Sequence, residues 1–452
     1  MKEGSTQAPI RHPLAWREAD FLAADKIEAE LTRVFDICHG CRRCFNLCDS
    51  FPRLFDLIDE SRTGELDSVS PADYAPVVAA CTLCDLCFMT KCPYVPPHEF
   101  DLDFPHLMLR ARAAEFAAGR VGLWQRQLGR TDRNGRLAGA LAPLVNWAST
   151  SGNGLTRPLM EGVVGIHREA EVPRFCARTL VAEAAGQPLE INRQAPAMGR
   201  QAVLFATCFV NYNNTASGQA ARLVLAHNGV DAQVAHPGCC GMPQFEHGDL
   251  EAVAAQARRV AQALAPALDE GRDVVALTPS CALMLKFEWP LLLPDDAAVR
   301  RLCEASVDIC QYLVDIAANE GLAPGLGALE GGVALHLACH ARAQNMGPKA
   351  AEMLRLLPDT ELSLIERCSG HGGSWGMMKE NFEVAIKVGR PVARQAAEAG
   401  RQWLASECPL AGAHVVQGIG RLEAAGPGVP DRAYHPIELM ARAWGLEGAA
   451  QP

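Results

Sequence analysis

Eight of the 18 cysteines lie between positions 38 and 92, in two closely spaced groups. The first group reads C-x2-C-x2-C-x3-C, and the second reads C-x2-C-x2-C-x4-C followed by proline. Their members are Cys38, Cys41, Cys44 and Cys48, then Cys81, Cys84, Cys87 and Cys92. Bacterial ferredoxins use C-x2-C-x2-C-x3-C-P, in which the fourth cysteine binds the other cluster. The spacing therefore predicts two [4Fe–4S] clusters.

We expect each cluster to take three ligands from one group and its fourth from the other. The expected ligand sets are Cys38, Cys41 and Cys44 with Cys92, and Cys81, Cys84 and Cys87 with Cys48. Two departures from the ferredoxin pattern bear on this crossing: Asp49 replaces the proline after Cys48, and one extra residue precedes Cys92. The alternative is a zinc-stabilised scaffold, but zinc sites usually use C-x2-C pairs separated by a dozen or more residues.

Composition and charge limit the classes of protein to which the chain can belong. The 452 residues suffice for several domains, and the cysteine fraction is far below that of a small disulfide scaffold. The first residues contain no apolar signal segment, so we expect a cytoplasmic, reducing compartment in which clustered thiols indicate metal or redox chemistry. No run of 18 apolar residues predicts a membrane span. A net charge of −10 argues against nucleic acid as a partner.

The second half of the chain contains an internal repeat. Cys208, Cys239-Cys240-Gly241 and Cys281 recur as Cys339, Cys368-Ser369-Gly370 and Cys408, at offsets of 131, 129 and 127 residues. A nearly constant offset indicates a duplicated domain. Short apolar runs such as QAVLFA, DVVAL and GVALHLA alternate with helical segments, which predicts parallel βαβ units. Each cysteine follows a predicted strand, where ligands gather in such sheets.

The fold class that we expect is therefore α+β or α/β with several domains. An N-terminal α-helical domain with two [4Fe–4S] motifs precedes two Rossmann-like α/β cysteine-rich repeats. The boundaries that we expect are 1–105 for the helical ferredoxin-like domain, 106–198 for a helical linker, and 199–325 and 326–452 for the two repeats.

This arrangement resembles a family of iron–sulfur proteins with cysteine-rich CCG domains. The family includes the iron–sulfur subunits of anaerobic glycerol-3-phosphate dehydrogenase and of glycolate oxidase, and subunits of heterodisulfide reductase. The segments HPGCCGMPQFEHGD and ERCSGHGGSWGMMKE carry much of the likeness. The resemblance implies an electron-transfer subunit of an oxidoreductase, without catalytic residues of its own. It would pass electrons from a flavoprotein dehydrogenase partner to quinone or another acceptor. The alternative is a heterodisulfide-reductase-like enzyme that uses the CCG cysteines.

The repeats contain fewer thiols than the five per repeat of the fuller family pattern. The candidate metal ligands are Cys208, Cys239, Cys240 and Cys281 in repeat 1, and Cys339, Cys368 and Cys408 in repeat 2. Four thiolates could hold an additional iron–sulfur centre, whereas three would need a different fourth ligand, for which His340 and His371 are candidates. We expect no metal role for Cys176, Cys303 and Cys310.

The linker segment is basic within an acidic chain. Residues 110–136 contain seven arginines and two acids, with Trp124 inside the segment and Trp147 in the apolar stretch that follows. Arginines on one helix face beside tryptophan are typical of a helix that lies on anionic lipid. A solvated face between two domains is the alternative. We therefore expect a location in the cytoplasm, with peripheral contact to the membrane surface or a partner as the specific hypothesis.

Overall fold

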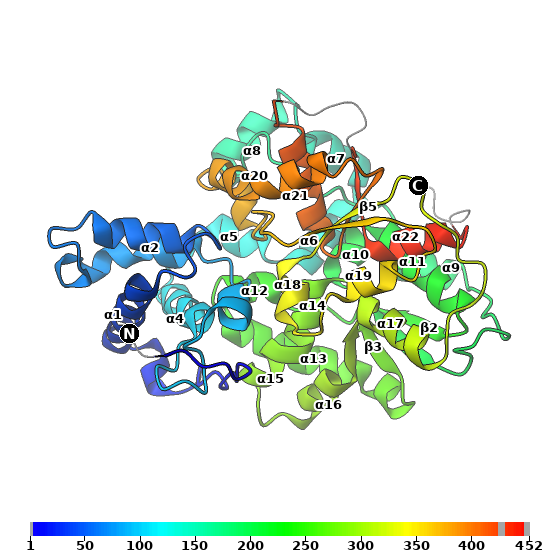
Figure 1. The fold of residues 1–452 in the computed structure, drawn as a ribbon, viewed down its shortest axis with the longest axis horizontal. Coiled ribbons are helices and arrows are strands. Elements are labelled where there is room, and N and C mark those ends of the chain that lie inside the picture. The colour runs from blue at the N-terminus through cyan, green and yellow to red at the C-terminus, as the bar shows by residue number, and fades with distance from the viewer. Residues whose placement is uncertain (1–2, 424–429, 447–452) are drawn as a thin grey trace.

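The computed structural model describes residues 3–423 and 430–446. A helical N-terminal region lies to one side of two α/β units, and a group of short helices packs partly on the first unit and partly beside the second (Figure 1). None of the helices in the described part of the chain combines the length and apolar content that crossing a bilayer requires.

The N-terminal region is built from helices around an aromatic core. Its main helices are α1 (Ala24–Cys41), α2 (Ser50–Asp59), α3 (Ala75–Ala80) and α4 (Phe104–Ala117), with a π-helical turn over Cys87–Lys91. Helix α2 is amphipathic, and its buried face packs Phe51 against Phe104 at 4.7 Å between ring centroids. Phe35 of α1 contacts the same ring. This packing leaves the cysteine motifs in the connections between helices.

Residues 123–186 form the short helices α5 (Leu123–Leu128), α6 (Thr131–Ala140), α7 (Ala142–Ser149), α8 (Thr156–Val164) and α9 (Leu180–Gly186). The expectation of one arginine-lined interfacial helix is wrong. The arginine-rich segment is split among α4, α5 and α6, because Gly119 with φ +76° ends the first helix and Gly129 and Arg130 separate the next two. Some of its arginines, such as Arg112, donate hydrogen bonds to backbone carbonyls inside the protein.

Repeat 1 contains a parallel sheet with strand order β2-β1-β3-β4. Its strands are β1 (Gln201–Phe205), β2 (Asp231–Ala235), β3 (Asp273–Ala276) and β4 (Ser306–Asp308). Its helices are α10 (Cys208–Tyr212), α11 (Thr215–His227), α12 (Met242–Glu246), α13 (Leu250–Asp269), α14 (Pro279–Leu283), α15 (Trp289–Leu292), α16 (Ala297–Ala305) and α17 (Ile309–Asn319). The central strands are apolar and buried, as parallel strands covered on both faces are.

Repeat 2 reproduces this topology, with strand order β6-β5-β7-β8, all parallel. Its strands are β5 (Val333–His336), β6 (Leu362–Ile365), β7 (Trp403–Ser406) and β8 (Ala433–Tyr434). Its helices are α18 (Cys339–Ala343), α19 (Lys349–Leu354), α20 (Phe382–Glu398), α21 (Pro409–Ile419) and α22 (Pro436–Ala443). The equivalent strand orders agree with the duplication that the cysteine offsets predict.

The two repeats share a hydrophobic core. Helix α22 of repeat 2 packs on α11 of repeat 1, where Glu438 accepts a hydrogen bond from Ser217 at 2.9 Å. Apolar side chains from both sheets belong to one continuous buried cluster. The repeats are therefore fixed relative to one another, with the carboxyl ends of their central strands close to the N-terminal region.

Candidate functional site

The first group of thiols lies at the end of α1. Cys38 and Cys41 occupy its last turn, and Arg42, with φ +54°, turns the chain so that Cys44 follows in a loop. The pKa of Cys38 is raised well above its ordinary value, chiefly by burial and then by the thiolates of Cys92, Cys44 and Cys41. The structure therefore places Cys92, from the second motif, beside three cysteines of the first.

Cys48 of the first motif lies beside thiols of the second motif. Burial raises its pKa most, followed by the thiolates of Cys84 and Cys81 in the second motif. The pKa of Cys87 is raised by burial and by Cys84 and Cys81, and more weakly by Cys44 and Cys48. Thiols of the two motifs thus lie among one another, with Cys92 near the first group and Cys48 near the second. The assignment of ligands to two clusters stays a prediction.

The chemistry of these donors fits iron–sulfur clusters. Burial raises the pKa of Cys84 to about 12, and burial with neighbouring thiolates raises the pKa of Cys44 to about 12. Buried thiolates that repel one another need positive charge among them, which coordinated iron supplies. Within the described residues, no group of His, Cys, Asp or Glu is arranged to hold a single metal ion.

Repeat 1 brings four thiols to the carboxyl ends of β1, β2 and β3: Cys208, Cys239, Cys240 and Cys281. The Sγ atoms of Cys208 and Cys239 lie 3.6 Å apart, and Gly241 donates its backbone N–H to the Sγ of Cys239 at 3.4 Å. Its hydrogen bond with Cys208, and then the one with Cys240, lower the pKa of Cys239 well below its ordinary value. Repeat 1 therefore has a compact buried set with one thiol that favours the anionic form.

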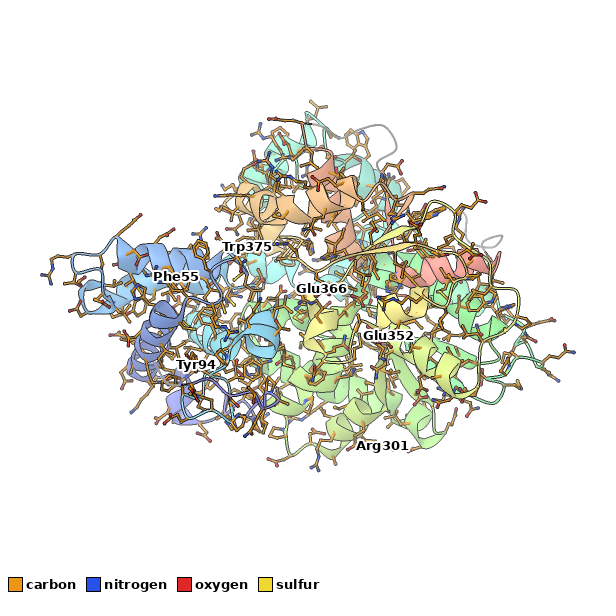
Figure 2. All side chains as sticks on the ribbon, in the orientation of Figure 1. Phe55, Tyr94, Arg301, Glu352, Glu366 and Trp375 are labelled. Atoms are coloured by element: carbon orange, nitrogen blue, oxygen red, sulfur yellow. The ribbon has the colours of Figure 1, made fainter. Side chains whose placement is uncertain are left out.

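Repeat 2 places its three thiols beside the N-terminal region. The pKa of Cys339 is raised well above its ordinary value by burial and then by the thiolates of Cys84, Cys368 and Cys408. These four thiols line one cavity of about 70 Å³ together with Cys48. Trp375, which also lines it, lies between the N-terminal helices and α20 (Figure 2). The thiols of repeat 2 therefore border the second ferredoxin-type set.

The two repeats also meet at their cysteines. Cys281 of repeat 1 raises the pKa of Cys408 in repeat 2, although burial is the larger cause and brings that pKa to about 11. Helices α14 and α18, which carry Cys281 and Cys339, pack against each other. The thiol-bearing ends of the two repeats therefore lie next to each other.

The histidines that the sequence suggested as ligands both line the thiol cavity. The Nε2 atom of His340 lies 3.3 Å from the carbonyl oxygen of Leu83. The Nε2 atom of His371 is buried and has no hydrogen-bond partner among the described residues. Burial lowers the pKa of His371 to about 3, so its imidazole is neutral at physiological pH.

A larger cavity, of about 610 Å³, adjoins the thiol cavity. The two share the lining residues Thr82, Glu246, Gly372 and Trp375. Burial raises the pKa of Glu246 to about 7, against the opposing effect of Arg112. Arg112 itself donates hydrogen bonds to the carbonyl oxygens of Val78, Cys81 and Glu246. Sequence reasoning assigned no role to Glu246 or Arg112, although both lie in segments that it singled out, because local pattern does not show which side chains line a cavity.

A buried ion network joins segments that are far apart in the sequence. The guanidinium of Arg11 donates to Asp85 at 2.8 and 2.9 Å, to Asp103 at 2.8 and 3.0 Å, and to Glu288 at 3.0 Å. His106 adds contacts to Glu288 at 3.0 Å and to Asp103 at 3.3 Å. The network fixes the loop between Cys84 and Cys87 against α4 and repeat 1.

The three cysteines without a predicted role stay outside these sets. Cys310 is buried just after β4, and Cys303 donates to the carbonyl oxygen of Lys286 at 2.9 Å. Cys176 accepts from Thr215 at 3.9 Å. Substitutions of these three cysteines can therefore serve as controls for substitutions in the thiol sets.

Comparisons with known proteins agree with the duplicated architecture. A family model described as CCG, cysteine-rich domain, matches residues 202–286 and again residues 333–415. The C subunit of anaerobic glycerol-3-phosphate dehydrogenase from Escherichia coli, in strain K12 and in O157:H7, is 26% identical over 350 residues, 76% of this chain and 82% of the relative. Citrate utilization protein B from Escherichia coli is 32% identical over 85 residues, 19% of this chain and 20% of that protein. The chain therefore carries the CCG cysteine-rich domain twice and is homologous to the C subunit of anaerobic glycerol-3-phosphate dehydrogenase.

Proposed function

We propose that the chain is an electron-transfer subunit of an oxidoreductase, with two [4Fe–4S] clusters in a ferredoxin-like domain at residues 1–105. The adjacency of the thiol sets carries this proposal. Cys44 of the first set neighbours Cys87 of the second, and Cys84 of the second neighbours Cys339 and Cys368 of repeat 2. Clusters bound there would accept and release electrons one at a time. The positions of the cysteines in the fold would fix the order of the clusters and the distances between them.

The electron donor that we propose is a flavoprotein dehydrogenase subunit. Homology to a subunit of a glycerol-3-phosphate dehydrogenase supports a partner with the substrate site. The linker at 106–198 and the repeats at 199–325 and 326–452 would then position the clusters between this partner and the acceptor.

The acceptor that we propose is a quinone. The cavity of about 610 Å³ borders Cys81, and Tyr74, Val78 and Trp375 contribute to its largely apolar wall. Binding pockets for small molecules are mostly apolar with a few polar groups, and Glu246 supplies one that can carry a proton near neutral pH. This cavity shares its wall with the thiol cavity, so an acceptor there would lie beside the second thiol set.

Metal analysis and visible spectroscopy test the electron-transfer proposal. We expect purified protein to be brown, to bleach with dithionite, and to contain at least about eight iron atoms per chain, four for each predicted cluster. It should also co-purify with a flavoprotein. Colourless protein that contains zinc would contradict the proposal, since a zinc scaffold has no redox transition.

The linker helices present an apolar surface that we propose lies on the membrane. No charged residue occurs between positions 137 and 156. The exposed apolar side chains of α6, α7 and α8 with their caps are Leu137, Leu141, Leu144, Trp147, Leu155, Leu159 and Val163. Helices α7 and α8 pack together at the edge of the molecule (Figure 1). Exposed Arg130 and Arg136 precede this surface and complement anionic lipid.

Flotation with vesicles that contain anionic lipid tests this surface. We expect the double variant Leu144→Glu, Leu159→Glu to lose about 100-fold or more in vesicle affinity, since each leucine that enters the lipid contributes roughly 1.5–3 kcal/mol. Leu356→Glu is the matched control, because Leu356 is also exposed but lies in repeat 2, after α19. Wild-type protein that does not float with anionic vesicles at low salt would refute the membrane proposal.

A further inference from the structure

Repeat 2 has one thiol fewer than repeat 1. Cys339, Cys368 and Cys408 follow β5, β6 and β7, and Ser369 stands at the position of Cys240. Iron–sulfur cubes are ordinarily held by four protein ligands. The three thiols of repeat 2 would therefore leave one iron without a cysteine ligand.

The space between these thiols accommodates a compact group. All three line the cavity of about 70 Å³, with Cys48 and Cys84 of the second ferredoxin-type set on its other wall, whereas a single water needs only about 10–15 Å³ of such space. Cys368 and Cys408 are both close enough to Cys339 for their charges to act on it, as is Cys84. The cavity therefore combines a soft donor set with room for more than solvent.

His371 lines this cavity, and one nitrogen atom of its imidazole is available to bind a metal. Its Nε2 atom is buried and has no hydrogen-bond partner among the described residues, whereas His340 contacts the carbonyl oxygen of Leu83. Buried polar atoms are nearly always hydrogen-bonded in folded proteins, so an unsatisfied one calls for an explanation. Imidazole nitrogen is an established iron ligand in clusters that replace cysteine by histidine.

The backbone on both sides of His371 is tightly packed, and this packing fixes the position of His371. A Cβ atom at Gly370, where φ is +79°, would come within 2.1 Å of the carbonyl oxygen of Ala385. A Cβ atom at Gly376 would come within 2.2 Å of the carbonyl oxygen of His371 itself. Glycine is thus required on both sides, and the loop holds His371 at the cavity wall.

We propose that His371 is the fourth ligand of a third iron–sulfur centre, whose other ligands are Cys339, Cys368 and Cys408. This inference rests on the proposed function, because it adds a further centre beside the second ferredoxin-type set. A neutral imidazole in place of a thiolate removes one negative charge from the ligand set. Such a replacement raises the reduction potential in clusters with histidine ligands. The third centre therefore belongs on the acceptor side of the two ferredoxin-type clusters.

Iron content and pulsed electron paramagnetic resonance test the ligand directly. We expect His371→Ala to contain about four fewer iron atoms per chain than wild type. Protein labelled with ¹⁵N-histidine should show a nitrogen coupling to the reduced centre, which His371→Ala abolishes. His371→Cys should restore the iron while the nitrogen coupling stays absent.

His414→Ala is the matched control. Its ring centroid lies 6.1 Å from that of His371 and its Nε2 is also buried without a partner among the described residues, but it does not line the thiol cavity. We expect it to keep both the iron and the nitrogen coupling. If His371→Ala retains the full iron content, or the coupling persists in it, the assignment is overturned.

The iron content also distinguishes a failure of this inference from a failure of the proposed function. About eight iron atoms in both wild type and His371→Ala, with dithionite bleaching intact, would refute the third centre and leave the electron-transfer proposal standing. Protein without any redox-active iron would overturn both.

Discussion

Cys84→Ser should remove the second of the two ferredoxin-type clusters and block electron transfer through the chain. Serine offers a hard oxygen in place of the soft thiolate that iron–sulfur clusters require. We expect the iron content to fall by about four atoms per chain, and electron transfer to fall by more than about 100-fold, since even outer-shell substitutions typically cost 10–100-fold. Iron analysis and electron paramagnetic resonance of the reduced protein measure the first effect, and stopped-flow reduction by the partner measures the second.

Two serine substitutions provide the comparison. Cys176→Ser should leave the iron content and electron transfer unchanged, because Cys176 lies outside the thiol sets and contacts Thr215. Cys240→Ser should leave both ferredoxin-type clusters spectroscopically intact, because its neighbours are Cys239 and Cys281 of repeat 1. If Cys240→Ser removes those clusters, the division between the N-terminal domain and the repeats is wrong.

Arg11→Met should lower the free energy of unfolding by about 3–5 kcal/mol. Arg11 donates to three carboxylates, and the side chains of Asp85 and Glu288 are only 5% and 2% exposed. Removing one member of a buried ion network leaves the others uncompensated, which costs roughly this amount. The opposing charges raise the pKa of Arg11 well above its ordinary value, although burial alone would lower it. Thermal or denaturant unfolding followed by circular dichroism measures the loss.

Arg17→Met is the control, because Arg17 is exposed and contacts the ring of Trp16. Surface substitutions of this kind change stability by at most about 0.5 kcal/mol. If the two variants unfold alike, the network around Arg11 does not stabilise the contact between the N-terminal segment and repeat 1.

The sequence by itself determined the local features of this protein. The spacing of cysteines from Cys38 to Cys92 identified two thiol groups, because a tight loop brings residues three positions apart to the same centre. The constant offset between Cys208 and Cys339 identified the duplication, and the apolar runs located the strands around it. Parallel strands end at one sheet edge, so the repeat thiols could be assigned to those edges from sequence order alone.

Only the tertiary structure decided which of these groups meet. That Cys84 borders the thiols of repeat 2 depends on how the N-terminal helices dock on the two sheets. The distinction between His340 and His371 likewise depends on a contact with Leu83, 257 residues away. The single interfacial helix expected from the arginines was wrong because local charge pattern does not reveal where a helix breaks or which side chains turn inward. Such contacts arise from packing between distant segments, which the pattern of neighbouring residues does not predict.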